Sequence, residues 1–258
     1  MLSGIEGNLA AYEAVLADIK RQRQPIEELY ILGDVIAATS ESTNVIQRIR
    51  SPHANETVSQ VCQGRWEEQL LILHGLGRTG EPTELIERYE IEMVKTLWDT
   101  IPQEMVEWVR LAQSATAKQP LDFGFFELDC LLIHGSSVGV SDELTPNTPA
   151  IQMLDRLMRM DANILFCGHS GLTFQYEIQQ GSVTSSITTL DQATLPKATF
   201  VKPRQVIGAG NVGRIPGRAT YTLYSLNTNQ IEFKTVRYGS GGGFQANQQD
   251  GKSFKALN

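Results

Sequence analysis

Five predicted strand ends in this 258-residue sequence combine glycine with polar side chains: SGIEGN (3–8), GD (33–34), GRWE (64–67), IHGS (133–136) and GHSG (168–171). Open α/β sheets bind ligands beyond the carboxyl ends of their strands, so these side chains can converge on one binding site. A second interpretation stays open for each of them. Asp34 can simply cap a helix or close a turn, and His134 and His169 can be core histidines whose hydrogen bonds are satisfied.

The elements that must position these side chains alternate between strand and helix in the first third of the chain. Asn8 can cap a helix whose apolar face is formed by Leu9, Tyr12, Val15, Leu16 and Ile19. The run Leu29–Leu32 predicts a short buried strand, residues 41–50 a second helix, and residues 58–62 another strand. This β-α-β-α-β order predicts a mostly parallel sheet.

Residues 68–120 have a different pattern. Apolar side chains recur there at helical spacing in two groups: Ile86, Tyr89, Met93 and Leu97, and Met105, Trp108, Val109 and Ala112. Thr100 with Gln103 fits a capping box. The segment holds nine acidic and five basic residues. We therefore expect a net-acidic helical insertion over about 68–120, near the ligand-binding end of a single domain that spans residues 1–238.

Strands return after the insertion, at 123–127, 130–134 and 164–167, with a helix that starts at Thr148-Pro149 between the last two. From Leu172 onward the pattern is that of strands alone, with hairpins predicted around Gln180-Gly181 and residues 227–230. The tail at 239–258 is rich in Gly, Gln and Asn, which predicts disorder. The expected fold class is α/β, with two packed sheets and helices outside.

The composition limits the classes of partner and the compartment. The net charge of -7 argues against non-specific nucleic-acid binding, because phosphate backbones require clustered Lys and Arg. No apolar run reaches the roughly 18 residues that cross a bilayer, and the residues after Met1 form no signal peptide. The three cysteines are widely spaced and predict buried thiols in a reduced, cytoplasmic protein: Cys62, Cys130 and Cys167.

The order of the glycine-polar segments resembles that of the calcineurin-like metallophosphoesterases, which carry D-x-H-G-N, G-D, G-N-H-D or G-N-H-E, a single His, and G-H-x-H. The matching segments are SGIEGNLAAYEAVL at 3–16, LGD at 32–34, LIHGS at 132–136, CGHSG at 167–171 and GAGNVGR at 208–214. The resemblance spans residues 1–238 apart from the insertion. It implies a four-layer α/β/β/α sandwich of two mixed sheets.

The resemblance also implies a metal site. Enzymes of this type clamp a phosphoryl group between two divalent cations about 3.5–4 Å apart. Asp34 matches the aspartate shared by both ions, His134 and His169 match ligands of the second ion, and Glu6 is the one remaining candidate beside Asp34 for the first. Asn8 matches the helix start that faces a phosphate, which places it with Asp34 and Arg65 among the candidate catalytic residues.

Five positions depart from the family pattern. Gly4 and Glu6 stand where the first Asp and His are expected, Arg65 and Trp66 replace the metal-binding Asn and the acid His, and Gly171 replaces the last His. We expect Arg65 to supply the missing positive charge through a forked pair with Asp34 or, second, Glu6.

The alternative is that Arg65 points into solvent. For Glu6 and Glu67, the favoured interpretation is a charge in the first turn of a helix.

Two functions follow from this pattern. The first is a pseudoenzyme or binding and scaffold protein in which hydrolysis is weak or lost; the alternative is a phosphatase or phosphodiesterase that runs on one ion at Asp34, His134 and His169. The cofactor is then one divalent metal (Mn, Fe, Zn or Ni) or none, and the ligand is a small phosphorylated molecule, with neither nucleic acid nor membrane as partner. Only Met1 and Leu2 precede Ser3, so either the first strand is shortened or the chain starts further upstream. The pattern predicts no oligomeric state.

Overall fold

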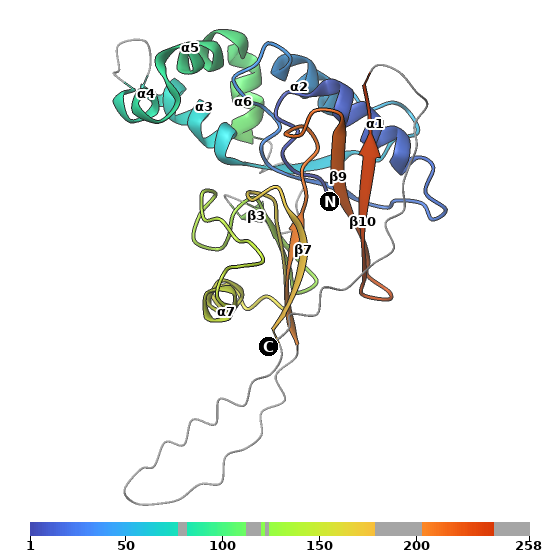
Figure 1. Cartoon of the computed structure of the whole chain (residues 1–258). Helices are drawn as coiled ribbons and strands as arrows, with labels where there is room; N and C mark the ends of the chain where they lie inside the picture. The colour runs from blue at the N-terminus through green and yellow to red at the C-terminus, as the bar shows by residue number, and fades with distance from the viewer. Residues whose placement is uncertain (77–81, 112–119, 122–123, 179–202, 240–258) are drawn as a thin grey trace, which may run out of the picture.

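The computed structural model describes residues 1–76, 82–111, 120–121, 124–178 and 203–239 (Figure 1). The predicted hairpin around Gln180-Gly181 and the predicted disordered tail from residue 240 lie outside the described residues. Within them the chain is a mixed α/β protein with several sheets and with helices packed around them, as the order of the predicted elements indicated.

One six-stranded sheet contains the strands from the middle of the chain, β3 to β8. Its order is β3-β4-β5-β6-β8-β7, and β5, β6 and β8 run parallel while the other pairs are antiparallel. The sheet is therefore mixed. Its strands are β3 (Pro120–Leu121), β4 (Gly124–Glu127), β5 (Cys130–Ile133), β6 (Ile164–Cys167), β7 (Thr173–Ile178) and β8 (Arg204–Ala209).

The remaining strands form two pairs that meet at the N-terminus. β1 (Leu29–Leu32) and β2 (Ser59–Cys62) are parallel, and β9 (Arg218–Ser225) and β10 (Gln230–Arg237) form the predicted second hairpin. Met1 and Leu2 lie between the two pairs. The Leu2 N–H donates to the Tyr30 carbonyl at 2.8 Å, and the Thr222 N–H donates to the Met1 carbonyl at 3.1 Å. Met1 and Leu2 thus connect β1 to β9 through backbone hydrogen bonds.

Seven helices are seen in the described part of the chain, and none of them is both long enough and apolar enough to cross a membrane. Asn8 caps the first one as predicted, because its Oδ1 accepts the Ala11 N–H at 3.0 Å. The capping box proposed for Thr100 is wrong, since Thr100 ends α5 and its hydroxyl donates to Thr96. The helices are α1 (Leu9–Ile19), α2 (Ser42–Arg50), α3 (Arg65–Leu76), α4 (Thr83–Tyr89), α5 (Ile91–Thr100), α6 (Gln103–Leu111) and α7 (Ala150–Met158).

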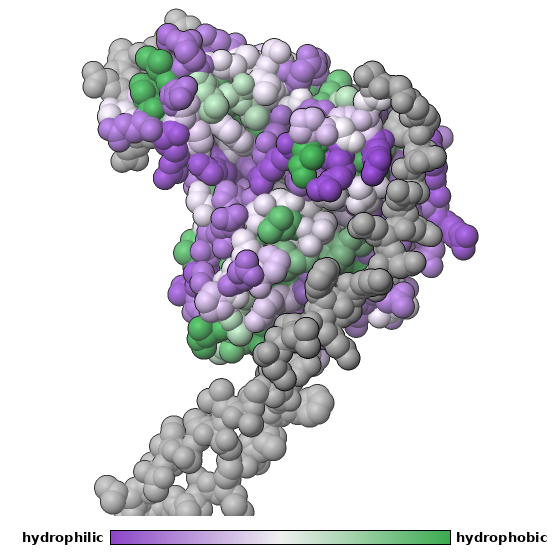
Figure 2. Space-filling view, viewed as in Figure 1, coloured by the Kyte–Doolittle hydropathy of each residue, from purple (hydrophilic) through white to green (hydrophobic). Residues whose placement is uncertain are grey.

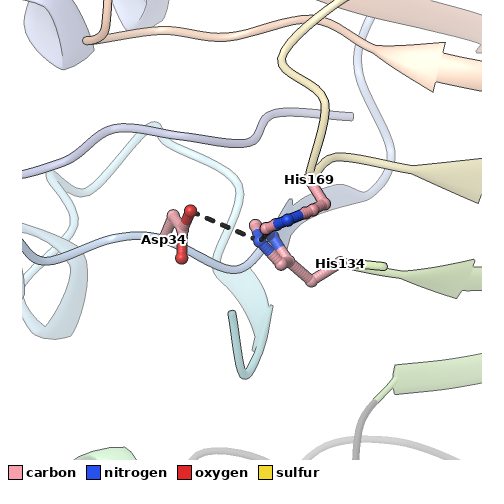
Figure 3. A group of neighbouring side chains, drawn as sticks. All are labelled: Asp34, His134 and His169. Atoms are coloured by element: carbon pink, nitrogen blue, oxygen red, sulfur yellow. Dashed lines mark hydrogen bonds and ion pairs between the residues drawn. The ribbon is translucent and has the colours of Figure 1, made fainter. Parts of the chain in front are cut away.

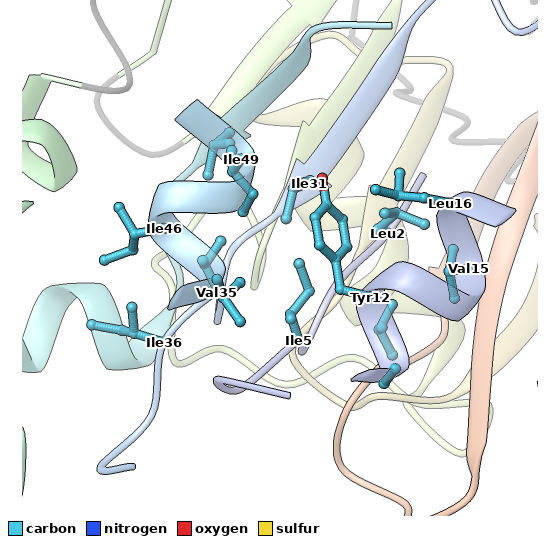
Figure 4. Packing of buried hydrophobic residues seen from close by; sticks show 14 of the residues in the cluster. Leu2, Ile5, Tyr12, Val15, Leu16, Ile31, Val35, Ile36, Ile46 and Ile49 are labelled. Carbon is cyan, nitrogen blue, oxygen red and sulfur yellow. The ribbon is translucent and has the colours of Figure 1, made fainter. Parts of the chain in front are cut away.

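Four apolar clusters are found among the described residues, and three of them pack the helices and strands of the main body together. α1, α2 and α6 pack against β1 through the largest cluster, part of which Figure 4 shows around Ile31 and Tyr12. α7 packs against the six-stranded sheet through Met153 and Leu157. The third cluster joins the two groups of strands: Phe166 of β6 is fully buried, and its ring lies 5.2 Å from that of Tyr224 on β9.

The helices α3 to α6 form a lobe at one end of the molecule (Figure 1), and α6 joins it to the largest apolar cluster. In Figure 2 the surface is hollowed between this lobe and the part that carries β3, β7 and α7, and hydrophilic residues lie along the helical side of the hollow. The helices lie where the sequence predicts a helical insertion.

The contact between the two groups of strands can be tested at Phe166. Replacing Phe166 with Ala leaves a cavity where the six-stranded sheet meets β9, and such changes cost about 3–5 kcal/mol of unfolding free energy. Urea denaturation should show this loss. Leu226→Ala is the control, because Leu226 is 55% exposed and should change stability by no more than about 0.5 kcal/mol. A loss below about 1 kcal/mol for Phe166→Ala would contradict the described packing.

Candidate metal centre

Three predicted ligands come together where β1 and two strands of the six-stranded sheet end. Asp34 follows β1, His134 follows β5 and His169 follows β6 after one glycine. One side-chain donor atom from each lies within 4.8 Å of the others (Figure 3). The backbone fixes the two histidines relative to each other, because the Gly168 and His169 N–H groups both donate to the His134 carbonyl at 2.7 Å.

Glycine is required where the loops after β1 and β2 touch. A Cβ on Gly33 would lie 2.3 Å from the Gly64 Cα, and Gly33 has a φ of +67°. Both features exclude an ordinary side chain. Asp34 itself has a φ of 52°, which is uncommon for a residue with a side chain. The close contact between these loops therefore directs the side chain of Asp34 toward the site.

The ring of His134 is held in one orientation. It is fully buried, and its Nδ1 lies 2.8 Å from the Leu32 carbonyl oxygen, which can only accept. Nδ1 therefore carries a proton, and Nε2 faces the site. Nε2 lies 3.0 Å from Nδ1 of His169 and 3.3 Å from Oδ2 of Asp34. A hydrogen bond from the other ring nitrogen to a backbone carbonyl is the usual support of a metal-binding histidine.

The pKa values of Asp34, His134 and His169 depend strongly on one another. Burial alone would raise the pKa of Asp34, but His134, the Trp66 N–H and Arg214 lower it to about 2. Burial opposes the charged form of His134, yet the Asp34 carboxylate raises its pKa. Burial and the charge of His134 lower the pKa of His169 to about 4. Asp34 thus favours the charged form of His134, and charge on His134 disfavours charge on His169.

The donor set fits a divalent ion. One carboxylate and two imidazole nitrogens are ligands that Mn, Fe, Zn and Ni accept. Metal ligands must be deprotonated at the donor atom, so binding an ion here would release any proton held between these donors. These residues would therefore hold one ion between Asp34, His134 and His169.

Glu67 supports the loop that carries Asp34. It is 3% exposed, and its carboxylate accepts the N–H groups of Asp34 at 2.8 Å, Ile36 at 3.0 Å and Gly64 at 2.8 Å. Glu67 does lie in the first turn of α3, as the favoured interpretation of it has it, but it is buried there and binds the loop of Asp34. Burial and the nearby Asp34 charge raise the pKa of Glu67 to about 7.

Arg214, in the loop between β8 and β9, contributes the cation of the site. Its Nε donates to Glu6 at 2.5 Å, one terminal nitrogen to the His169 carbonyl at 2.7 Å, and the other to Asp34 at 2.9 Å. Glu6 is thus part of the site, but as the partner of Arg214 and not as a member of the Asp34, His134 and His169 group. The favoured interpretation of Glu6 as a charge in the first turn of a helix is wrong.

The predicted pair between Arg65 and a site carboxylate is not present. Arg65 begins α3, and its guanidinium lies over the Tyr89 ring at 5.1 Å from the ring centre. Its Nε has no hydrogen-bond partner. The positions of the neighbouring side chains explain this, because Tyr89 also packs against the ring of Trp66 at 5.1 Å and holds both side chains toward α4.

The side chain of Asn8 has a structural role. Its Oδ1 caps α1, and its Nδ2 donates to the Tyr238 hydroxyl at 2.8 Å and to the Gly213 carbonyl at 3.2 Å. These contacts use its side-chain donor and acceptor atoms within the protein. Asn8 thereby ties the first loop to the loop of Arg214.

Sequence reasoning missed the roles of Glu67 and Arg214. Both lie in segments that carried the resemblance, GRWE at 64–67 and GAGNVGR at 208–214. Glu67 occupies the acidic position of the G-N-H-E motif, which was a usable signal. The signal for Arg214 was the presence of a cation at the end of a glycine-rich segment that follows a strand.

Comparison with known proteins identifies the fold. The sequence matches no protein-family model, and comparison with curated proteins finds no match. Among solved structures, the chain is similar to a metallophosphoesterase from Sphaerobacter thermophilus, with a TM-score of 0.59 and 20% identity over 92% of this chain and 87% of that one. It is also similar to a hypothetical protein from Pyrococcus horikoshii OT3, with a TM-score of 0.62 and 19% identity over 93% and 87% of the two chains. The chain therefore has the calcineurin-like metallophosphoesterase fold.

Glu67→Gln tests how the loop of Asp34 is supported. The amide places a donor against one of three backbone N–H groups, which should lower the unfolding free energy by about 1–3 kcal/mol at pH 5. The pKa of Glu67 is raised on folding, so its contribution is complete below about pH 4.5 and is lost as the pH rises through about 7. The difference in unfolding free energy between wild type and Glu67→Gln should therefore become smaller toward pH 8.

Chemical denaturation from pH 4.5 to 8 measures this difference. Glu27→Gln is the matched control, because Glu27 is exposed and should give a small, pH-independent change. A loss of unfolding free energy in Glu67→Gln, relative to wild type, that becomes larger with rising pH would contradict this account.

Proposed function

We propose that this chain is a pseudoenzyme on a metallophosphoesterase fold, which binds a small phosphorylated ligand and at most one divalent ion and hydrolyses phosphoesters weakly or not at all. One observation carries the proposal. The described residues provide a single three-donor group, Asp34, His134 and His169, whereas a two-metal clamp requires two such groups.

The retained donors explain why a phosphorylated ligand is the proposed class. A divalent ion bound by them supplies Lewis-acid stabilisation of a phosphoryl oxygen. The chain itself positions the donors: the Leu32 carbonyl orients His134, and the Trp66 N–H donates to Oδ1 of Asp34 at 2.9 Å. Oδ2 of Asp34 remains directed toward His134.

Loss of the proton donor explains why hydrolysis is proposed to be weak. The resemblance puts the leaving-group acid at Trp66, and the ring there packs against Tyr89. An indole N–H does not protonate a leaving oxygen near neutral pH. General acid catalysis is worth about 10²–10⁴ in rate, so this change alone removes much of the activity.

A phosphoesterase that uses one ion is the second candidate. The observation in its favour is that the Leu32 carbonyl and the Trp66 N–H order His134 and Asp34 in the way that neighbouring groups orient metal ligands. In this reading Asp34, His134 and His169 hold the only catalytic metal.

We also infer the full four-layer order from the packing clusters. The Phe166 cluster lies between the two groups of strands, while α1 and α2 cover β1 and α7 covers the six-stranded sheet. This supports two sheets packed face to face, joined at the N-terminus through Met1 and Leu2.

Metal content and hydrolysis together test the proposal. Purified protein dialysed against Mn²⁺ should bind no more than one ion per chain by elemental analysis, and Asp34→Ala should abolish binding. Turnover of bis-(p-nitrophenyl) phosphate with added Mn²⁺ should be no faster than that of Asp34→Ala.

Two results would contradict the proposal that this chain is a pseudoenzyme. Two ions per chain would show that a second donor set exists, and turnover that Asp34→Ala abolishes would favour the single-metal phosphoesterase. His53→Ala serves as the control for both assays, because His53 is exposed and lies outside the site.

A further inference from the structure

The guanidinium of Arg214 fills a space that two glycines leave open. A Cβ on Gly171 would lie 2.8 Å from a terminal nitrogen of Arg214, and a Cβ on Gly4 would lie 3.3 Å from its Nε. Both glycines have positive φ, +59° at Gly4 and +68° at Gly171. A side chain at either position would be directed onto the guanidinium.

Each nitrogen of the same guanidinium donates a hydrogen bond to a group around it. Its three nitrogens donate to Glu6, Asp34 and the His169 carbonyl. Two carboxylates and one carbonyl oxygen thus converge on one positive group that is 25% exposed. Oxygen atoms arranged in this way around a cation resemble the ligands that surround a metal ion.

The loop of Arg214 is fixed to both glycine segments. The Gly213 N–H donates to the Gly4 carbonyl at 2.7 Å, and the Asn211 side chain donates to the Gly171 carbonyl at 2.8 Å. A Cβ on Gly213 would lie 1.9 Å from the Ile5 carbonyl oxygen. Arg214 therefore extends from a rigid loop.

We propose that the Arg214 guanidinium takes the place of the first metal ion. The resemblance leaves Asp34 and Glu6 as the candidates for that ion, and it places Gly4 and Gly171 where an Asp and a His are expected. Arg214 contacts Glu6 and Asp34 and fills the space beside both glycines, so it lies at the point that these four positions surround. A permanent single charge thereby neutralises carboxylates that a divalent ion would otherwise hold.

This inference deepens the proposed function and rests on its single metal site. With Arg214 in place, the chain can bind an ion only at Asp34, His134 and His169. Without Arg214, the site loses the cation between Glu6 and Asp34 and has room for another. The number of bound ions therefore depends on Arg214, whether or not the protein hydrolyses anything.

The decisive experiment restores the two ligands and removes the arginine. Gly4→Asp, Gly171→His and Arg214→Ala are combined in the full-length protein, and Mn²⁺ binding is measured by equilibrium dialysis. Asp and His are among the residues that best tolerate positive φ. The triple variant should bind two ions per chain, and the Gly4→Asp, Gly171→His double variant that keeps Arg214 should bind no more than one.

A folded triple variant that binds no more than one ion would overturn the inference, as would a double variant that binds two. The wild-type stoichiometry tests the proposed function separately, because a wild type that hydrolyses esters with one ion leaves this inference intact. Circular dichroism establishes whether each variant is folded.

Arg214→Ala alone provides a second test that does not depend on the glycine replacements. It leaves Glu6 and Asp34 facing each other without a cation, so the metal-free melting temperature should fall by several degrees. Added Mn²⁺ should then raise it by more than it raises that of wild type. Arg218→Ala is the control, because Arg218 is exposed on β9. A melting temperature of Arg214→Ala that responds to Mn²⁺ as wild type does would overturn the inference.

Discussion

The carboxylate of Asp34 is 2% exposed, and the rest of the site compensates for burying its charge. An isolated ion in a protein interior is costly, so a buried carboxylate needs cations and hydrogen bonds. Asp34 has a proton-bearing His134 on one side, Arg214 on another, and the Trp66 N–H on its second oxygen. Glu67, also buried, sits behind it and binds the backbone and not the side chain.

This constraint accounts for the arrangement of the surrounding loops. The segment with Asp34 comes from one group of strands, whereas His134 and His169 come from the other. Packing around Phe166 brings the groups together, and the loop between β8 and β9 carries Arg214 across to Glu6. Removing any one charge leaves the others uncompensated, so the site behaves as a unit and single substitutions should not have additive effects.

Much of the fold and part of the site follow from the sequence. The alternation of strands and helices, the hairpin before residue 239 and the convergence of Asp34, His134 and His169 depend on local periodicity and on strand ends, which a sequence displays. The identity of the compensating cation does not. Arg65 and Arg214 are equally available as charges, and only the packing of Tyr89 over Arg65 and the positions of Gly4 and Gly171 beside Arg214 decide between them.

The most direct measurement is anomalous scattering from crystals of the wild-type protein grown with Mn²⁺. The account predicts one anomalous peak per chain, between Asp34, His134 and His169, with the guanidinium of Arg214 ordered between Glu6 and Asp34. A second peak beside Gly4 and Gly171, with Arg214 displaced from it, would contradict the account.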